Sequence, residues 1–302
     1  MKVLIIGYGS IGRRHDEVLS SFSEIESIDI VTKQNIDNRT IYKSIQEIED
    51  ISQYSYFIIA SQTTMHYEQL VYLDLHVKNK IIFCEKPLFE SKKKLEIVNN
   101  EVYIGYVLRF HPLLQKLKDF LQNDKAINVN VKCGQYLPTW RPNTDYKKSY
   151  SSKKDEGGGV LLDLSHEIDY VQWLFGKIED IKSYQVKISD LDIDSDDLTV
   201  ILGKIQKNMI VNISIDYISK ITHRRLIVDT FDNSYELDFI SNKLTKKDKN
   251  GLEEIYSFTN LERNFMFEKM HKSILEDKKY ICTYNDGLDV MDTIGIIQGQ
   301  NI

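Results

Sequence analysis

The sequence predicts an α/β chain in two parts: a doubly wound parallel sheet, then an α+β part with a large, mostly antiparallel open sheet. Over roughly the first 108 residues, short apolar segments alternate with helix-like segments, as they do when strands run parallel. A glycine-rich turn directly follows the first apolar segment. Beyond that point, longer segments of alternating apolar and polar residues follow one another with short connections, which is typical of an antiparallel sheet.

The first expected domain is residues 1–108, which contains five short strands and the helices between them. We expect its strands at 2–6, 28–31, 56–60, 80–84 and 102–107. We expect helices at 13–22, within 61–75, where a loop leads into the helix, and at 91–100, where Ser91 is suited to cap the first turn.

The second expected domain is residues 109–302. Alternating segments predict strands at 127–136, 181–188, 198–205, 209–217, 224–231 and 235–240. Helical patterns occur at 110–122, after the three glycines that end at Gly159, at 258–277 and at 285–299. The last helix is expected to pack back on the first domain.

Composition narrows the class of protein. The 302 residues are 42% hydrophobic and 28% charged, which is ordinary for a globular chain, and the net charge of −6 offers no basic excess for nucleic acid. The cysteines, odd in number and scattered, argue against a disulfide framework or a metal site: Cys84, Cys133 and Cys282. No apolar run matches a signal peptide or a membrane span. We therefore expect a cytoplasmic protein.

Gly7, Gly9 and Gly12 form a G-x-G-x-x-G pattern between a strand and a helix. The first glycine permits a tight turn, the second lets backbone approach a pyrophosphate, and the third lets helix and strand pack closely. The pattern predicts dinucleotide binding, with further cofactor contacts expected from the intervening residues Tyr8, Ser10 and Ile11. The alternative is a glycine-rich turn without a ligand.

The residue after the second strand helps to select between NAD and NADP. An acid there would accept a hydrogen bond from the ribose 2′-hydroxyl and favour NAD. Thr32 and Lys33 occupy these positions, and Asp29 lies inside the strand. These two residues, together with Arg39, are suited to hold a 2′-phosphate, so NADP is slightly favoured. The alternative is that Lys33 is a solvated turn lysine.

Glu85, Lys86 and Pro87 follow the fourth strand, at the sheet edge that faces the ligand crevice in open α/β sheets. Pro87 favours an extended backbone at Lys86. A lysine held at this edge is suited to hydrogen-bond cofactor and substrate and to move a proton. The alternative is a surface lysine in a strand–helix loop.

Five segments together resemble the Gfo/Idh/MocA family, named for glucose–fructose oxidoreductase and inositol dehydrogenase: GYGSIGRRH, SQTTMH, EKP, GYVLRFHP and GGGVLLDLSHEID, in that order. The resemblance covers essentially the whole chain. It implies a Rossmann domain, a C-terminal domain with a large open sheet, bound NAD(P), and oxidation or reduction of a sugar, a cyclitol or a derivative. It also implies dimers or tetramers through the open sheet. Within the first domain it adds cofactor contacts at Ser61, Thr63, His66, Glu85 and Lys86.

The chain departs from the family pattern at two places. The loop after the third strand reads Ser61-Gln62-Thr63-Thr64, where the family often has a proline. Asp163 and His166 are three residues apart, where the family usually spaces them by four.

The resemblance implies that Lys86 and His166 relay the proton during hydride transfer, and that Asp163 orients the substrate or its neighbours. Histidine suits this work because its ordinary pKa lies near neutrality. Which of Lys86 and His166 is the base stays open. In one continuous helix, Asp163, His166 and Tyr170 would share a face. The alternative for His166 is an ordinary helix histidine.

The segment 135–150 is dense in aromatic and charged residues. Aromatic rings are suited to stack on a sugar or base, and Arg141 is suited to bind a carboxylate or phosphate through two hydrogen bonds. The expected substrate contacts are Arg109, Tyr136, Trp140, Arg141, Tyr146 and Tyr150. If the loop binds substrate, an anionic or nucleotide-linked sugar is favoured; the alternative is an ordered surface loop.

Together these observations predict an NAD(P)-dependent oxidoreductase that acts on a CH–OH group of a sugar derivative. Two other classes remain open. One is a glycosidase that uses bound NAD for transient oxidation, and the other is a non-catalytic sensor that binds the cofactor.

Overall fold

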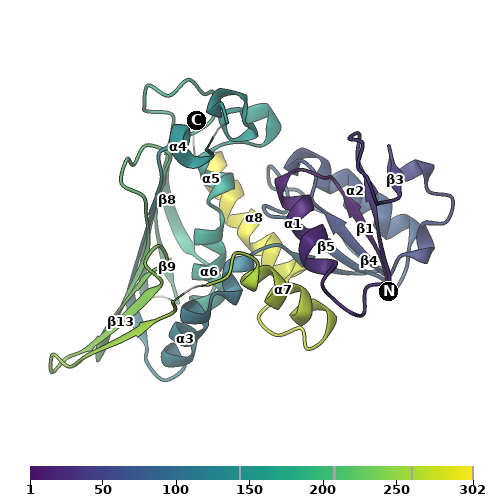
Figure 1. The fold of residues 1–302 in the computed structure, drawn as a ribbon. Helices are drawn as coiled ribbons and strands as arrows, with labels where there is room; N and C mark the ends of the chain where they lie inside the picture. The colour runs from purple at the N-terminus through teal and green to yellow at the C-terminus, as the bar shows by residue number, and fades with distance from the viewer. Residues whose placement is uncertain (143, 207–208, 260, 301–302) are drawn as a thin grey trace. The chain divides into compact units, whose positions relative to one another are not determined.

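The chain, described by a computed structural model at residues 1–142, 144–206, 209–259 and 261–300, divides into two compact units. Unit 1 comprises Met1–Val107 and Glu262–Met291, and unit 2 comprises Leu108–Leu261 and Asp292–Ile302. Figure 1 shows the helices and strands of each unit. A late part of the chain therefore returns to the first unit.

Unit 1 is built on a seven-stranded sheet in the order β15-β6-β5-β4-β1-β2-β3. All neighbouring pairs are parallel except β15 with β6. Strands follow one another outward in two directions from β1, so the order reverses between β1 and β4, which is where such sheets bind ligands. The doubly wound parallel sheet expected from the sequence is confirmed. Its strands are β1 (Lys2–Ile6), β2 (Ser27–Val31), β3 (Ile41–Tyr42), β4 (Tyr56–Ile59), β5 (Ile81–Cys84), β6 (Glu101–Ile104) and β15 (Cys282–Thr283).

The central strands of this sheet are almost entirely apolar, as is typical of parallel strands that are covered on both faces. All residues of β4 are buried, as are the last four of β1. The helices of unit 1 are α1 (Ser10–Leu19), α2 (His66–His76) and α7 (Phe265–Leu275), with short 3₁₀ turns η1 (Ile45–Glu47), η2 (Ile51–Gln53) and η3 (Thr63–Met65).

The helix predicted at residues 91–100 is wrong. Residues 92–98 have neither helix nor strand, and their burial alternates: Leu95 and Ile97 are half-buried, whereas Glu96 and Val98 are exposed. A spacing of two between inward side chains suits an extended backbone rather than a helix. The hydroxyl group of Tyr284 donates to the Leu95 carbonyl at 2.9 Å, which helps to hold the extended segment.

Unit 2 contains an eight-stranded sheet in the order β14-β13-β12-β11-β7-β10-β9-β8. Its neighbours are antiparallel apart from the parallel pair β7 and β10, which confirms the mostly antiparallel sheet. The strands are β7 (Ala126–Gly134), β8 (Glu179–Val186), β9 (Leu198–Ile205), β10 (Met209–Asp216), β11 (His223–Thr230), β12 (Asn233–Asp238), β13 (Lys243–Asp248) and β14 (Glu253–Ser257). We did not predict β13 and β14, which both contain charged residues; β14 is an edge strand of the sheet, where charged residues are common.

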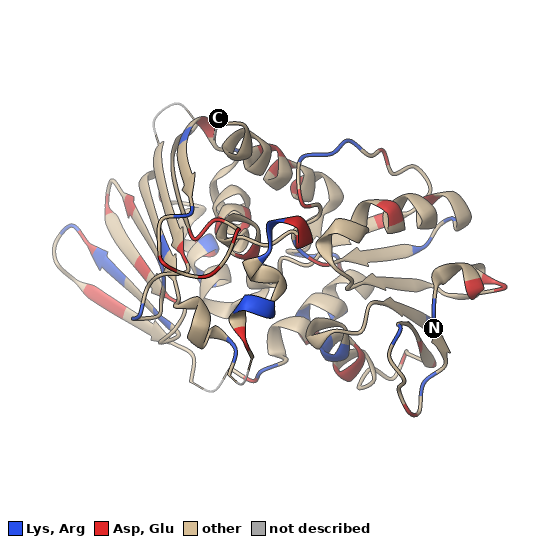
Figure 2. Cartoon of the chain, turned by 90° about the horizontal axis from the view of Figure 1, so that it is seen from above, with Lys and Arg blue, Asp and Glu red and all other residues tan. Residues whose placement is uncertain are grey.

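One face of this sheet is covered by α3, α5 and α6, which lie on the same side in Figure 1. Figure 2 shows acidic and basic residues on the strands of the same sheet. The helices of unit 2 are α3 (Pro112–Leu121), α4 (Leu137–Trp140), α5 (Val160–Asp163) and α6 (His166–Phe175), with 3₁₀ turns η4 (Val107–Phe110), η5 (Tyr146–Lys148), η6 (Tyr150–Ser152) and η7 (Lys154–Glu156). The final helix, α8 (Tyr284–Gly299), contributes residues to both units.

The continuous helix predicted across Asp163, His166 and Tyr170 is also wrong. Asp163 is the last residue of α5 and His166 the first of α6, with Leu164 at φ −101° and ψ 27° between them. Hydrogen bonds between residues three apart, such as Ile168 N–H to the Ser165 carbonyl at 3.1 Å, replace the α-helical pattern here. The uninterrupted helical face on which we grouped the three side chains does not exist.

Candidate functional site

The glycine-rich turn of unit 1 has two glycines that packing requires and one that it does not. Gly7 has φ +95°, and a Cβ atom on it would lie 2.6 Å from the Cα of Ser61. A Cβ atom on Gly12 would lie 2.2 Å from the Gly7 carbonyl oxygen, whereas one on Gly9 would meet nothing within 4 Å. Helix α1 begins at Ser10 with Gly9 as its N-cap. The backbone at Gly9 and the start of α1 therefore fit a pyrophosphate.

The residues after β2 differ in how far they are available to a ligand. Thr32 is buried, and its hydroxyl accepts a hydrogen bond from the Gln34 backbone at 3.2 Å. Lys33 is exposed. Arg39 is paired with Asp16, its Nη2 lying 2.8 Å from Oδ1. The Arg39 guanidinium is thus already held by a carboxylate on α1.

Sequence reasoning missed two side chains beside the glycine turn. Gln34 donates to the Tyr8 carbonyl at 3.0 Å, and Arg13 donates to Gln34 at 2.5 Å while lying 4.9 Å from the Tyr8 ring centre. Tyr8 in turn donates to Asp16 at 2.5 Å, and burial first, with that bond second, raises the pKa of Tyr8 to about 12. Arg13 directly follows the third glycine of the motif, and this position could have indicated a residue beside the cofactor turn.

His66 connects the loops that follow β4 and β5. Its Nδ1 lies 3.1 Å from the Pro87 carbonyl oxygen and its Nε2 lies 3.3 Å from that of Ser61. Burial lowers the pKa of His66, while the carbonyl groups that face both ring nitrogens act in the opposite direction. Ser61 is also held by Gln69, to which its hydroxyl donates at 2.7 Å, and Thr63 begins the turn η3. The expected contacts of the β4 loop therefore lie at the carboxyl edge of the sheet.

The Glu85–Lys86–Pro87 segment lies at the same edge, directly after β5. Glu85 is largely buried, and its Oε2 accepts from the Lys86 backbone N–H at 3.2 Å. Its Oε1 lies 2.9 Å from Nε2 of His15 on α1. Lys86 is half-buried, and the peptide bond to Pro87 is cis. Unit 1 thus brings the glycine turn, the β4 loop and the lysine loop to one edge of its sheet.

In unit 2 the Asp163 carboxylate is buried among hydroxyl groups. Ser151 donates to its Oδ2 at 2.6 Å and Tyr217 donates to the same oxygen at 2.5 Å. His166 is half-buried at the start of α6. Asp163 therefore holds the segment around Ser151 against the sheet, while His166 belongs to the following helix.

The three glycines before α5 accommodate neighbouring protein groups. A Cβ atom on Gly158 would lie 2.1 Å from the Tyr150 carbonyl oxygen, and one on Gly159, which has φ +116°, would lie 2.1 Å from Asp196 Oδ1. Asp196 caps α5 from a distant loop, because its Oδ2 accepts from the Leu161 backbone N–H at 2.9 Å. The glycine run thus allows both the close loop and this external cap, which sequence reasoning did not find.

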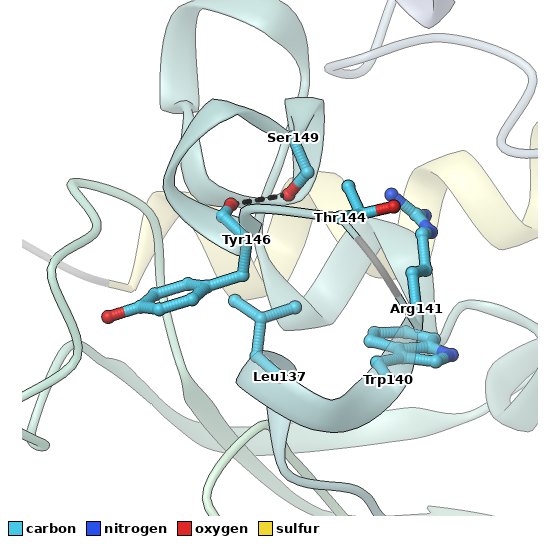
Figure 3. A pocket seen from close by; sticks show the side chains of 6 residues that line it. All are labelled: Leu137, Trp140, Arg141, Thr144, Tyr146 and Ser149. Carbon is cyan, nitrogen blue, oxygen red and sulfur yellow. Dashed lines mark hydrogen bonds between the residues drawn. The ribbon is translucent and has the colours of Figure 1, made fainter.

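The aromatic loop forms a small hollow of about 210 Å³, counted with space that opens to solvent. Figure 3 shows Arg141 extending beside Trp140, with Tyr146 on the other side of Leu137. The Arg141 guanidinium carbon lies 5.0 Å from the Tyr150 ring centre and 5.8 Å from that of Trp140. Arg141 also donates to the Tyr150 hydroxyl at 3.3 Å. Three predicted residues, Trp140, Arg141 and Tyr146, line this hollow together.

Two predicted substrate residues lie elsewhere in unit 2. Arg109 is 2% exposed and forms a two-point ion pair with the fully buried Asp169, with Nη2 at 2.7 Å and Nε at 3.1 Å from Oδ1. Tyr136 is the N-cap of α4, and Lys220 lies 4.4 Å from its ring centre. The structure therefore places Arg109, which follows the fifth strand predicted from the sequence, in the interior of unit 2, where it is paired with Asp169 on α6.

Other kinds of site find no support in the described residues. Among them, no three His, Cys, Asp or Glu side chains lie close enough to bind a metal together. All cysteines are unpaired and buried. Within that same part of the chain, every helix is too short or too polar to cross a membrane.

The fold of unit 1 and its glycine turn define a nucleotide-binding α/β protein. Comparison with known families extends this assignment: residues 1–101 match the model described as oxidoreductase family, NAD-binding Rossmann fold. Residues 115–236 match the GFO/IDH/MocA C-terminal domain. The chain belongs to the Gfo/Idh/MocA family, as its motifs had indicated.

Three known proteins illustrate the similarity. Glucose-6-phosphate 3-dehydrogenase of Bacillus subtilis is 26% identical over 243 residues, which are 70% of this chain and 66% of that protein. The WlbA dehydrogenase of Bordetella pertussis, solved with NADH and UDP-GlcNAcA, has a TM-score of 0.81 at 13% identity, covering 99% of this chain and 95% of that one. A super-repressor mutant of Gal80p from Saccharomyces cerevisiae has a TM-score of 0.83 at 16% identity, covering 100% and 95%.

Matches to curated relatives span from 38% to 66% of the relatives' own length. The structural likenesses, at 13% and 16% identity, concern the fold alone.

Proposed function

We propose that this chain is an NAD(P)-dependent oxidoreductase that transfers hydride between the nicotinamide and a CH–OH carbon of a sugar derivative. The observation that carries the proposal is the sheet edge of unit 1. There the open backbone at Gly9 and the helix start at Ser10 are next to loops that His66 and Glu85 hold in place. When bound, NAD(P) would supply the hydride acceptor or donor.

We assign proton movement to Lys86 and His166. Oxidation of a CH–OH group releases the hydroxyl proton, which an amine or imidazole near its pKa can accept. The assignment rests on residue chemistry and on the family motif, and either residue serves as the base within it. Asp163 is assigned a positioning role, because its carboxylate already accepts from Ser151 and Tyr217.

The substrate class that we favour is an anionic or nucleotide-linked sugar. Arg141 brings a guanidinium to a hollow lined by Trp140 and Tyr146, a combination that suits a charged group beside a flat ring or sugar face. The names of related proteins agree with this class: glucose 6-phosphate is anionic, and UDP-GlcNAcA is a nucleotide sugar.

For the cofactor we favour NADP over NAD. No acidic residue follows β2, where Thr32, Lys33 and Gln34 stand. Lys33 is exposed, and Arg13 lies next to Gln34. Arg39, which we expected to contact a 2′-phosphate, is paired with Asp16. We therefore propose that Lys33 and Arg13 bind the 2′-phosphate.

The decisive experiment is a substrate screen with both cofactors. Nucleotide sugars, sugar phosphates, uronates and neutral sugars are each incubated with NAD⁺ and with NADP⁺, and reduced nicotinamide is followed by absorbance. For the best substrate, Lys86→Ala should lower kcat by about a hundredfold or more while the cofactor still binds. The matched control is Lys78→Ala, which changes an exposed lysine just after helix α2. Activity that survives Lys86→Ala nearly intact would refute the mechanism.

The screen also separates the two alternative functions. A glycosidase that uses transient oxidation would cleave a glycoside without net cofactor turnover, which product analysis detects. A sensor would bind cofactor and ligand without any product, and the similarity of fold to Gal80p keeps this alternative in view.

We further propose that the chain forms a dimer or tetramer through the open face of the unit 2 sheet. Leu202 on β9, Ile255 on β14 and Tyr184 on β8 are exposed apolar residues of this sheet. Light scattering after size exclusion measures the assembly, and Leu202→Glu should dissociate it. The matched control is Leu75→Glu, which changes an exposed leucine of unit 1. A monomeric wild-type chain would refute the proposal.

A further inference from the structure

A chain of hydrogen bonds crosses the interior of unit 1 and ends at the lysine loop. The hydroxyl of Tyr56 lies 2.8 Å from Nδ1 of His271, and Nε2 of His271 lies 2.8 Å from Nδ1 of His15. Nε2 of His15 then lies 2.9 Å from Oε1 of Glu85. Tyr56, His15 and His271 are fully buried. His271 lies on α7, in the part of the chain that returns to unit 1 late in the sequence.

The carboxylate sets the direction of every bond in this chain when both imidazoles are neutral. The Glu85 oxygen accepts, so Nε2 of His15 carries the hydrogen and its Nδ1 is bare. His271 must then donate from Nε2, which leaves its own Nδ1 to accept from Tyr56. Burial first, and His15 second, lower the pKa of His271 well below the ordinary value, which favours the neutral ring.

The surroundings of the chain strengthen these bonds. The His15 ring packs edge-on against Phe83 and Phe267, with ring centres 4.9 and 5.5 Å away. Hydrogen bonds are stronger in such apolar surroundings, and an unpaired nitrogen there is more costly. Gly105 leaves room for the carboxylate, since a Cβ atom on it would lie 3.0 Å from the Glu85 carboxyl carbon.

The Glu85 carboxylate joins this chain to Lys86. One oxygen contacts His15, and the other accepts from the backbone N–H of Lys86 at 3.2 Å. We propose that His271 is a positioning residue for Lys86, acting through His15 and Glu85 to fix the backbone of the lysine loop. The placement stands on these contacts alone, whereas the importance of Lys86 rests on the proposed function.

The test compares His271→Leu with His271→Gln. Leucine removes the donor to His15, whereas the glutamine amide can still donate. Two readouts use the cofactor-free protein. In protein labelled with ¹⁵N-histidine, long-range ¹⁵N–¹H NMR spectra report which ring nitrogen of His15 carries the hydrogen. Trace acetylation followed by peptide mass spectrometry reports the reactivity of the Lys86 amine relative to that of the exposed Lys78. A third readout is NADH affinity, measured by protein fluorescence.

We expect Nε2–H on His15 in the wild type and, in His271→Leu, a displaced ¹⁵N shift of the bare Nδ1, which has lost its donor. The relative reactivity of Lys86 and the affinity for NADH should each change by about fivefold in the leucine variant, as the loss of one buried hydrogen bond implies. His271→Gln should stay close to the wild type. The proposal is wrong if both variants lower the melting temperature equally while the His15 spectrum and the Lys86 reactivity stay unchanged. His271 would then contribute to packing alone.

If His271→Leu does not fold, His15→Leu is compared with His15→Gln instead. His15 contacts Glu85 directly, so these variants test the same chain of hydrogen bonds. Unchanged Lys86 reactivity in a folded His15→Leu protein would equally overturn the proposal. Failure of the proposed function shows differently: the substrate screen would give no turnover, while the tautomer and acetylation results would still follow the predicted pattern.

Discussion

The hydroxyl group of Tyr217 donates to the carboxylate of Asp163 across 2.5 Å, inside unit 2. Tyr217 directly follows strand β10, and Asp163 ends helix α5. The same carboxylate accepts from Ser151, so one oxygen joins a strand end, a helix end and a loop. This carboxylate therefore stabilises the protein whatever else it does during a reaction.

Tyr217→Phe should reduce the free energy of unfolding by about 1.5–3 kcal/mol, because the lost hydrogen bond is made to a charged group. Urea unfolding followed by circular dichroism measures this change. Tyr72→Phe on α2 is the control, since the half-buried Tyr72 ring stacks on His76 and its hydroxyl group contacts no buried carboxylate among the described residues, so the midpoint should stay unchanged. An unaltered midpoint in Tyr217→Phe would contradict the assigned role.

Arg109→Leu should destabilise the protein by about 3–5 kcal/mol, since it leaves the Asp169 carboxylate buried without its partner. The control Arg225→Leu removes an exposed arginine that contacts Asp238 at 3.3 Å, and it should cost less than about 1 kcal/mol. Chemical denaturation distinguishes the two variants. If Arg109→Leu retained full stability yet bound substrate more weakly, the original assignment of Arg109 to substrate binding would be restored.

The two glycines Gly9 and Gly12 should respond differently to alanine. Gly9→Ala should fold normally, since its Cβ meets nothing within 4 Å, but the methyl group would obstruct a pyrophosphate and weaken NADH binding by about tenfold or more. Gly12→Ala should destabilise the fold, because its Cβ would lie 2.2 Å from the Gly7 carbonyl oxygen. Melting temperature and fluorescence titration separate these effects. Normal NADH affinity in Gly9→Ala would exclude the proposed cofactor position.

Lys33→Glu should shift the preference from NADPH to NADH. A carboxylate after β2 repels a 2′-phosphate and can accept from a 2′-hydroxyl, so the ratio of the two affinities should change by about tenfold or more. Separate titrations with NADH and NADPH give the ratio. Lys2→Glu, at the opposite end of strand β1, serves as the control for net charge. A ratio that stays the same would remove Lys33 from the cofactor site.

Stability should fall as the pH drops below about 6.5, the ordinary pKa of histidine. Burial lowers the pKa of His66, His111 and His271, so the unfolded chain binds protons that the folded chain does not. Each such histidine changes the free energy of unfolding by up to about 1.4 kcal/mol per pH unit. Above the pKa of histidine in the unfolded chain, its stabilising contribution is fully present. His271→Gln should reduce the slope between pH 6.5 and pH 5 by about one proton, measured from urea midpoints. An identical slope would mean that His271 is protonated in the folded protein.

Much of the architecture follows from local patterns. The buried runs of β1, β4 and β5 and the turn at Gly7 each specify their own conformation, because apolar continuity and positive φ are properties of short segments. The strands of the second sheet are likewise indicated by alternation, except for β13 and β14, where charged residues conceal the pattern. The helix expected at residues 91–100 failed because inward spacing of two at Leu95 and Ile97 was overlooked.

The candidate site was predictable only as a list of residues. Gly7, Gly12, Lys86 and the residues of the aromatic loop were marked by their type and position. The ion pair between Arg109 and Asp169 could not be predicted from the sequence. The two residues are far apart along the chain, and any buried acid could have been the partner.

The sequence by itself determined the two-part α/β fold, the nucleotide turn and the family motifs, because each depends on residues that are close together along the chain. Only the tertiary structure decided which polar groups are already paired. Asp196 caps α5, Asp163 receives Tyr217, and His271 reaches Glu85 through His15. The physical reason is that a buried polar group needs a partner, and packing between distant segments chooses which one it finds.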